Sequence, residues 1–237
     1  MTQPSATTTP APSSLRPEPV PSSSSASRGP NSATVGLLAT LVAKPGKEAE
    51  VAELLQAGQQ LVEQEAQTLI WFSFRISEDT FGIYDAFADE AGRAAHLEGR
   101  LAAALMGRAD ELLAVAPRIE PVQILGRKYV AGTNVAIGTP VGLSVRLHAK
   151  PEQRDELERL LVAGQAMVEA ESQTPVWFAF RISADEFGIY DVFPSDAGRT
   201  AHVEGELAAA LLGRADELLA EPPSIAPVDV LAGMRRE

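Results

Sequence analysis

The side chains able to move a proton near neutral pH are few in this chain and come in matched pairs. The chain has three histidines and no cysteine. His96 and His202 close two similar stretches, FGIYDAFADEAGRAAH and FGIYDVFPSDAGRTAH, which also contain Asp85 and Asp191. An imidazole oriented by a carboxylate can act as a general base. We therefore identify Asp85 with His96, and Asp191 with His202, as candidate catalytic pairs.

The same pairs also have a purely structural interpretation. His96 could end an apolar stripe and satisfy a buried aspartate, and its repetition at His202 could reflect duplication alone. The sequence leaves both interpretations open. The absence of cysteine excludes disulfides, thiolate metal sites and a cysteine nucleophile. No cluster of histidines and carboxylates suggests a metal, and no glycines form a phosphate loop.

The chain is a duplication. Residues 35–125 align without a gap with residues 141–231, a shift of about 106 residues, and most aligned positions are identical. A period this long indicates a repeated domain, because solenoid units run to about 20 to 50 residues. Any functional site is therefore expected twice.

Charge and hydropathy limit the partners and the compartment. The formal net charge is −12 over 237 residues, with no basic cluster. Nucleic acid and anionic membranes both bind positive surfaces, so neither is an expected partner. No apolar run reaches the roughly 18 residues of a membrane span, and the N-terminus lacks the apolar segment of a secretory signal. We expect a cytoplasmic protein.

Each copy is expected to contain four strands and two helices in the order βαββαβ, the ferredoxin-like arrangement. In the first copy, apolar runs and turn residues indicate strands at 34–43, 70–77, 81–88 and 119–125 and helices at 47–66 and 89–114, the second with a bend near Gly99. Pro121 has no N–H for a ladder, which favours an edge position for the last strand. Two helices cover one face of such a sheet, so the second copy is expected to cover the other.

Alternation along the strands assigns side chains to the two faces of each sheet. The row toward the helices is predicted to contain Ile70, Phe72, Phe74 and Ile76 of the second strand and Phe81, Ile83, Asp85 and Phe87 of the third. The opposite row is predicted to contain Trp71, Ser73 and Arg75 with Gly82, Tyr84 and Ala86. Asp85 is then the only charge in an apolar row, and it points toward the layer that contains His96.

The face turned toward the other copy is expected to carry Arg75, Arg181, Tyr84 and Tyr190. We expect the arginines to pair with acidic side chains across the interface, with an anionic ligand as the alternative. The tyrosines are expected to pack there with satisfied hydroxyls.

Two further patterns leave alternatives open. Three alternate positions of the first strand change between copies, from Leu38, Thr40 and Val42 to Ser144, Arg146 and His148. Either a one-sided polar wall inside a barrel or an exposed strand edge explains them. Glycines repeat within the helix patterns, at 58, 92, 99 and 107 and again at 164, 198, 205 and 213. They indicate either close approach of helix and sheet or room for a ligand.

The stretches that end in His96 and His202 each follow a β-hairpin and precede an alanine-rich helix. They resemble the antibiotic biosynthesis monooxygenase family of the dimeric α+β barrel superfamily. In that family an acid, an aromatic residue and a histidine lead from the third strand into a helix. The matching residues are Asp85, Phe87 and His96, and again Asp191, Phe193 and His202. The resemblance implies an α+β fold in which two ferredoxin-like halves pack sheet to sheet as a pseudo-dimeric barrel within one monomeric chain.

The resemblance also implies an activity. It points to a monooxygenase that needs no cofactor or metal and acts with O2 on a small aromatic, quinol or polyketide-like molecule. The aromatic residues expected near the two pockets are Trp71, Phe74 and Phe87, and Trp177, Phe180 and Phe193. The alternative is a non-catalytic module, built on the same barrel, that binds a small ligand or another protein.

The sequence departs from the family at two points. The aromatic residue at the strand end is commonly Trp in the family and is Phe here. A related branch degrades haem with an Asn in the first strand, where this chain has Ala39 and Val145, so haem degradation is disfavoured.

The expected organisation has four parts. Residues 1–33 form a disordered Pro/Ser/Thr-rich tail, because this composition cannot bury enough apolar surface to fold. Residues 34–127 form the first copy, 128–140 a linker and 141–237 the second copy.

Overall fold

The structure is a computed structural model that describes Met1, residues 29–130 and residues 140–236. The first copy contains β1 (Val35–Val42), α1 (Glu48–Val62), β2 (Thr68–Arg75), β3 (Thr80–Phe87), α2 (Glu90–Leu97), α3 (Arg100–Leu112) and β4 (Arg118–Tyr129). The second contains β5 (Val141–His148), α4 (Arg154–Glu169), β6 (Val176–Arg181), β7 (Glu186–Phe193), α5 (Asp196–Val203), α6 (Glu206–Gly213), α7 (Ala215–Leu218) and β8 (Ser224–Arg235). Short 3-10 turns lie at Pro30–Ser32 and Pro151–Gln153. The expected βαββαβ order is confirmed in both copies.

Local sequence explains where the helix of residues 90–112 begins and breaks. The Asp89 side chain accepts a hydrogen bond of 3.1 Å from the Gly92 N–H and so caps α2. Gly99 has an extended backbone and separates α2 from α3. The expected long helix with a bend is therefore two helices, which change direction beside His96.

The eight strands form one closed barrel in the order β1-β3-β2-β8-β5-β7-β6-β4. The closure depends on the two long strands that end the copies. The first half of β4 pairs with β1 of its own copy, and the second half pairs with β6 of the other copy. The strand β8 divides in the same way between β5 and β2. The predicted pseudo-dimeric barrel is confirmed, and each copy supplies a strand to the other.

The expectation that the strand after α3 lies at an edge needs correction, because β4 lies within the closed barrel, where residues 118–123 pair with β1 and residues 123–129 pair with β6. Its proline is tolerated for a local reason. Ile124 donates its N–H to Thr34 O on the β1 side. Alternation then directs the Pro121 nitrogen to the opposite side, where pairing with β6 begins only at Gln123. The missing N–H therefore faces a place without a partner strand.

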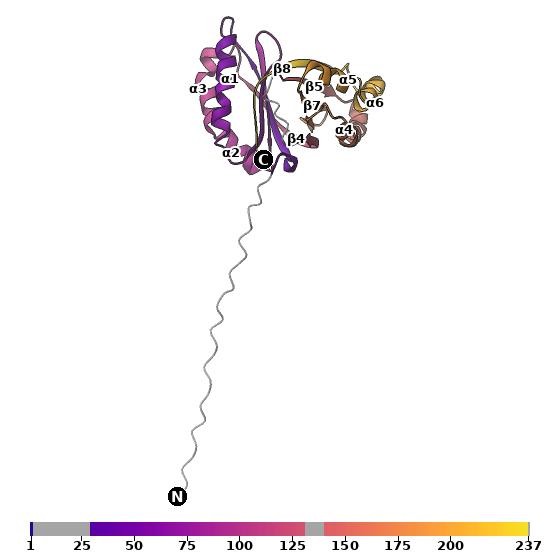
Figure 1. Ribbon diagram of the computed structural model, residues 1–237, viewed down its shortest axis with the longest axis horizontal. Coiled ribbons are helices and arrows are strands. Elements are labelled where there is room, and N and C mark those ends of the chain that lie inside the picture. The colour runs from indigo at the N-terminus through magenta and orange to yellow at the C-terminus, as the bar shows by residue number, and fades with distance from the viewer. Residues whose placement is uncertain (2–28, 131–139, 237) are drawn as a thin grey trace.

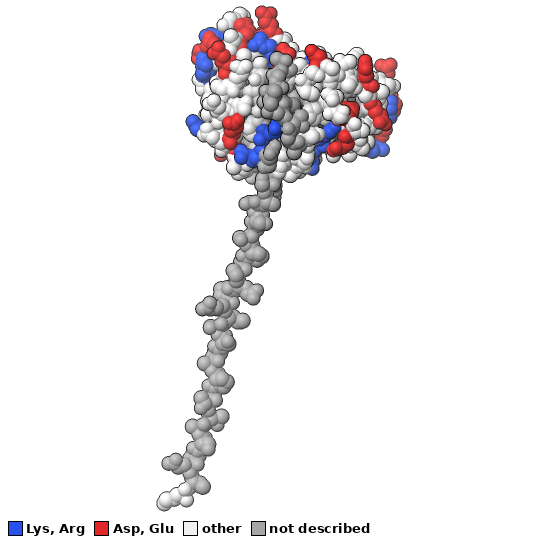
Figure 2. Space-filling view, viewed as in Figure 1, with Lys and Arg blue, Asp and Glu red and all other residues white. Residues whose placement is uncertain are grey.

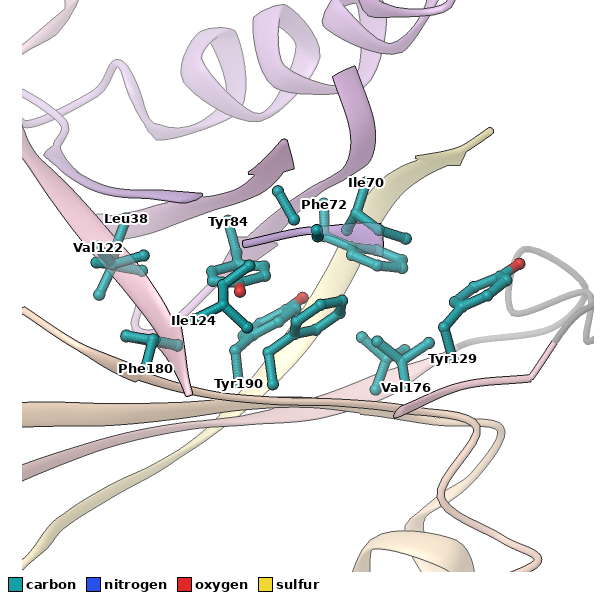
Figure 3. Packing of buried hydrophobic residues seen from close by; sticks show 14 of the residues in the cluster. Leu38, Ile70, Phe72, Tyr84, Val122, Ile124, Tyr129, Val176, Phe180 and Tyr190 are labelled. Atoms are coloured by element: carbon teal, nitrogen blue, oxygen red, sulfur yellow. The ribbon is translucent and has the colours of Figure 1, made fainter. Parts of the chain in front are cut away.

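The barrel is filled by a core to which both copies contribute (Figure 3). Tyr84 and Tyr190 stack with ring centroids 5.1 Å apart, and Tyr84 also stacks on Phe180 at 5.3 Å. Phe74 stacks on Tyr190 at 4.8 Å. Aromatic pairs at these separations add to the stabilisation from burial. The interface between the copies is thus an apolar core.

The prediction for the faces of β2 is wrong. Ile70, Phe72 and Phe74 lie inside the barrel, and Trp71 lies under the helices with Phe81 and Ile83. The cause is that both faces of β2 are buried, so alternation shows two rows without showing which one meets the helices. The faces of β3 were predicted correctly, with Tyr84 inside and the row that includes Asp85 outside.

The helices lie outside the barrel on opposite faces of the molecule, α1 to α3 on one side and α4 to α6 on the other (Figure 1). Because β4 and β8 cross between the copies, α1 packs against β8 and α4 packs against β4. Glycine permits close packing at one point of each long helix. A Cβ on Gly58 would lie 2.8 Å from Leu101, and one on Gly164 would lie 2.7 Å from Leu207.

Two expectations for the interface need correction. Arg181 pairs with Glu158 of its own copy, and Arg75 stacks over the Phe81 ring at 4.9 Å, so neither arginine pairs across the interface. Arg75 and Arg181 lie on the same strand faces as Trp71 and Trp177, which point toward the helices. Tyr84 and Tyr190 do pack between the copies, but their hydroxyls have no hydrogen-bond partner among the described residues.

The three alternate positions of the first strand that differ between the copies lie on the face that points into the barrel. In the second copy they lie near one end of the barrel. Arg146 of β5 pairs with Glu120 of β4 and with Glu186 of β7, and Arg118 binds Glu120 at 2.6 Å. This four-residue cluster joins the two copies through largely buried carboxylates. The matching positions at the other end are uncharged: Thr40, Thr80, Ser224 and Ala226. The one-sided polar wall is confirmed, and the alternative of an exposed edge is excluded because the sheet is closed.

The ordered structure begins earlier than the expected end of the tail. Pro30 and Ala33 are buried, and Asn31 binds β4 by donating to Tyr129 O and accepting from Arg127 Nε. Lys128 and Tyr129 belong to β4 and not to a linker. Residues 2–28 and 131–139, which include most of the expected tail and linker, lie outside the described residues.

Among the described residues, no helix is both long and apolar enough to cross a membrane. Basic and acidic side chains are interspersed over the face of the molecule shown in Figure 2.

The internal closure predicts that the 25.1 kDa chain is a monomer in solution. Both sheets already cover each other, so no apolar inner face is left for a second chain. Light scattering of the untagged protein is expected to give the mass of one chain at micromolar concentration. A stable dimer whose barrels are assembled between chains would contradict this prediction.

Candidate functional site

The site of the first copy lies between the sheet and helix α2. Asp85 projects from β3 into the layer under the helices, and His96 lies in the last turn of α2. Their closest atoms, Asp85 Oδ2 and His96 Nε2, are 3.5 Å apart, an ion-pair distance and too long for a strong hydrogen bond. On its other side His96 Nδ1 donates to Glu65 Oε2 at 2.6 Å. The imidazole is thus held between two carboxyl groups.

The third member of this group, Glu65, was missed in the sequence. It lies in the turn between α1 and β2, where Thr68 Oγ1 donates to Glu65 Oε2 at 2.8 Å. The pattern Glu-x-x-Thr directly before the second strand recurs as Glu171 and Thr174. Its repetition is a signal, but polar residues in the same region, such as Glu63 and Gln64, made this glutamate hard to single out.

The second copy reproduces the arrangement closely. The distance from His202 Nδ1 to Glu171 Oε2 is 2.6 Å, and that from His202 Nε2 to Asp191 Oδ2 is 3.5 Å. Thr174 Oγ1 donates to Glu171 Oε2 at 2.6 Å. The chain therefore has two Glu–His–Asp groups, one on each outer side of the barrel.

Burial and charge set the protonation of the pair. Burial raises the pKa of Asp85 to about 7; the nearby His96 opposes this rise, and Glu65 adds to it. Burial by itself lowers the pKa of His96, but Asp85 and the hydrogen bond that His96 donates to Glu65 outweigh it, so the pKa of His96 is raised. The last turn of a helix also favours a protonated imidazole. The raised pKa of His96 favours its protonated form, and a pKa of about 7 lets Asp85 exchange its proton near neutral pH; the same causes raise the pKa of Asp191 to about 7 and that of His202.

Each pair faces a small apolar cavity of about 40 Å³. Among the described residues of the first copy, Asp85 and His96 are its only charged or polar lining, and the other lining residues come from β1, β3, α2, α3 and the start of β4. Asp85 Oδ1 is buried and accepts no hydrogen bond from any described residue. The cavity exceeds the roughly 10 to 15 Å³ that a water needs, but it is far below the 300 Å³ or more of a typical ligand pocket.

The predicted aromatic residues have three different positions. Phe87 and Phe193 lie against the histidine rings, with centroids 5.4 and 5.3 Å apart. Trp71 and Trp177 lie in the helix-side cores but do not line the cavities. The expectation that Phe74 and Phe180 lie near the pockets is wrong, because both point into the barrel.

Each site is supported by a cation from the other copy. Lys128 of β4 donates to the carbonyl oxygens of Val168 and Glu171, at 2.8 and 2.6 Å. Arg236, just after β8, donates to Glu65 O at 2.6 Å. Both cations bind carbonyls at the end of the site's first helix or in the turn that follows it, where positive charge is favourable. The crossing strands thus fix the backbone that carries Glu65 and Glu171.

Within the described residues there is no group of three or more His, Asp or Glu side chains placed to hold a metal ion. The three-residue groups described above do not converge on one point, because the imidazole lies between the two carboxyls. The chemistry that the site can supply is proton transfer at Asp85 and stabilisation of an anion by the His96 cation.

The fold and the site define a fused α+β barrel of two ferredoxin-like halves, each with a buried acid and imidazole facing an apolar cavity. No family model matches the sequence, and no curated protein sequence matches it significantly. Solved structures do match. A proposed monooxygenase from Fusobacterium nucleatum superposes with a TM-score of 0.73 at 12% identity, over 86% of this chain and 94% of that one.

Two further structures extend the comparison. A proposed monooxygenase from Lactobacillus acidophilus gives a TM-score of 0.72 at 10% identity, over 86% of this chain and 96% of that one. An anthrone oxidase-like protein gives 0.56 at 13% identity, over 85% and 92%. At these identities the likeness establishes the fold. The chain shares with these structures a fold of two ferredoxin-like halves closed into one barrel, which is the fold that the resemblance implied.

The buried aspartates predict an unusual dependence of stability on pH. The folded protein holds the Asp85 proton up to about pH 7, whereas the unfolded chain releases it near its ordinary pKa of 3.8. The folded state therefore binds more protons in this interval, and the free energy of unfolding falls as pH rises through it, by roughly 4 kcal/mol per carboxyl. The raised pKa of His96 acts in the same direction above pH 6.5.

The substitutions Asp85→Asn and Asp191→Asn are each expected to remove the loss of unfolding free energy that their own carboxyl causes as the pH rises. Relative to the wild type, each variant should gain stability when the pH is raised from near 4 to near 8, as measured by urea denaturation. An Asp79→Asn variant, at an exposed carboxyl whose pKa is lowered by Ser77 and Thr80, serves as the control and should show no such gain. Equal pH dependence in all four proteins would contradict the protonation assigned here.

The Glu65 hydrogen bond predicts a change that can be read at one histidine. Glu65→Gln removes a carboxylate that raises the pKa of His96, so that pKa should fall while the pKa of His202 stays unchanged. Glu171→Gln should produce the reverse. With only three histidines, NMR titration of the ring protons resolves each one. A fall at both histidines, or at neither, would show that the carboxylate does not act locally on its own imidazole.

Proposed function

We propose that the protein is a monooxygenase that uses O2, without a cofactor, on a small aromatic weak acid such as a quinol or a polyketide-like phenol. One observation carries the proposal: in both copies a buried carboxyl with a pKa of about 7 faces an apolar cavity beside an imidazole whose pKa is raised by its two carboxyl neighbours. A base with a pKa near the working pH is well suited to remove a proton. The fold shared with proposed monooxygenases and an anthrone oxidase-like protein supports the same class.

The roles follow from the protonation of the pair. The Asp85 carboxylate takes the acidic proton of the bound substrate, and the His96 cation stabilises the anion that forms. His96 is thus the electrostatic partner and Asp85 the base, the reverse of the roles in a pair whose imidazole takes the proton. Phe87 packs against the imidazole ring, and Glu65 fixes it from behind.

The overall reaction balances without an added reductant. The electron-rich anion gives its electrons to O2, and a carbon–oxygen bond forms. Protonation by the Asp85 carboxylic acid gives a hydroperoxide. The carbon that bears this group then loses its remaining hydrogen as a proton while the O–O bond breaks, so the C–H electron pair forms a carbonyl, one oxygen atom stays in the product and the other leaves as water. The apolar lining protects the anion from competing protonation by solvent.

The small volume favours a second candidate. A cavity of about 40 Å³ cannot hold a polycyclic molecule in this conformation, so a module that binds a small apolar ligand without turning it over fits the same geometry. The two candidate functions differ in whether the bound molecule is oxidised: the monooxygenase turns it over and the binding module does not. The cytoplasm is the proposed compartment for both.

The proposal predicts oxygen consumption that depends on both aspartates. The metal-free protein, incubated with a panel of quinols and anthrone-like phenols, should consume O2. Asp85→Asn or Asp191→Asn should remove about half of the turnover, and the double variant should lose 100-fold or more, since a positioned base contributes about 10² to 10⁴. His96→Ala with His202→Ala should also reduce turnover, through loss of anion stabilisation.

Circular dichroism must show that the double variants are folded. Binding without turnover in the wild type would support the binding module. Equal turnover in all folded variants would overturn the assignment of Asp85 and Asp191.

A further inference from the structure

Exposed apolar side chains are concentrated at the mouths of the two cavities. Within the described part of the chain, ten large apolar side chains are exposed, and six of them line these cavities. They are Leu97, Met106 and Ile119 in the first copy and Val203, Leu212 and Ile225 in the second. Each cavity therefore reaches the surface through a rim of three apolar side chains, which we call the mouth.

The roof of the first cavity is one short segment of α3. Leu101, Ala102, Leu105 and Met106 all line the cavity, and Gly99 and Gly107 flank this segment of residues 100–106. The roof of the second cavity, residues 206–212, is flanked by Gly205 and Gly213 in the same way. A glycine at each end gives the roof two points at which the backbone can turn.

The two flanking glycines differ in their surroundings. A Cβ on Gly99 would lie 2.6 Å from Glu65 Oε1 and 2.8 Å from His96 O, so close packing against the site requires glycine there. A Cβ on Gly107, or on Gly213, would meet nothing within 4 Å. Packing therefore does not explain a glycine in the middle of α3, where it weakens the helix relative to alanine.

The two copies differ at the residue after this glycine. In the first copy α3 runs unbroken through Gly107 to Leu112, whereas in the second α6 ends at Gly213, and Arg214, with φ −115° and ψ 10°, separates it from α7 at Ala215. The residue after each glycine is anchored. Arg108 Nη2 donates to Glu50 of α1 at 2.9 Å, and Arg214 Nη1 donates to Glu156 of α4 at 2.9 Å. The roof can therefore turn at the glycine while the rest of the helix stays attached.

We propose that each cavity is the closed form of a binding site for a neutral aromatic molecule with one weakly acidic hydroxyl, which enters through the mouth when the roof segment turns at Gly107 or Gly213. The apolar mouth and lining select the aromatic body. The unpartnered Asp85 Oδ1 at the bottom accepts the hydroxyl proton. A ligand that carried a full charge would meet no compensating group at the mouth. This inference deepens the proposed function, because it gives the substrate class and its path to Asp85.

The roof motion is tested by hydrogen exchange of the full chain, followed by mass spectrometry. Gly107→Ala should slow exchange in residues 100–106 about fivefold, because alanine stabilises the helix by about 1 kcal/mol and no atom obstructs its Cβ. Exchange in residues 206–212 should not change. Gly213→Ala should have the reverse effect, so each variant is the control for the other. Unchanged hydrogen exchange in both roof segments of the two variants would contradict the proposed roof motion.

The ligand path is tested with 2-naphthol as the fluorescent probe, without any oxygenase assay. The double variant Met106→Glu and Leu212→Glu should weaken binding about tenfold or more, and Gly107→Ala with Gly213→Ala should slow association. The matched control is Val115→Glu with Val162→Glu, which changes exposed apolar residues that do not line a cavity.

An equal loss of binding in the control, or no loss in the mouth variant, would overturn the proposed path. Naphthol binding that requires the mouth but occurs without oxygen consumption would retain this inference and contradict the monooxygenase. Absence of naphthol binding by the wild type would contradict the ligand class.

Discussion

The sharing of β4 and β8 between the copies is the constraint on which the other features depend. Each of these strands has twelve residues, about twice what pairing with one neighbour uses. The second half of each strand leaves its own sheet and completes that of the other copy. This exchange closes the barrel, encloses Tyr84 and Tyr190, and brings Lys128 and Arg236 to the opposite sites. A site in either copy therefore depends on the presence of both.

The buried acid is stabilised by its neighbours only in part. Asp85 lies in an apolar layer, and an isolated ionised carboxylate there is costly. His96 reduces this cost, but at 3.5 Å and without a hydrogen bond it leaves Asp85 Oδ1 unsatisfied. Such an arrangement favours a site that exchanges a proton over one that contributes stability. The hydrogen bond to Glu65 raises the pKa of His96 and so favours the protonated imidazole beside Asp85.

The parts of the fold that depend on local pattern could be predicted from the sequence. The duplication, the hairpin of β2 and β3 and the Asp89 cap each follow from residues close together in the chain. The approach of Asp85 to His96 could also be predicted, because β3 has one charged residue in an apolar row. The faces of β2 could not, since Trp71 and Phe72 are both fully enclosed and hydropathy does not distinguish a helix layer from a barrel interior.

Features that depend on contacts between residues far apart in the chain could not be predicted from the sequence. The division of β4 at Gln123 depends on where β6 lies, and nothing near Gln123 indicates it. Glu65 became significant only when α2 brought His96 beside it, from 31 residues away. The aromatic character of Phe74 suggested a pocket, but the position of the other copy decided that it would be core.

The ion-pair cluster of Arg118, Glu120, Arg146 and Glu186 occurs at one end of the barrel only. In a homodimer built from two identical chains, every substitution is present twice, so a charge introduced at one end would also appear at the other. The fused chain removes that coupling. The two ends of this barrel are already different, and each half can therefore accumulate its own substitutions without the same change being imposed on its counterpart.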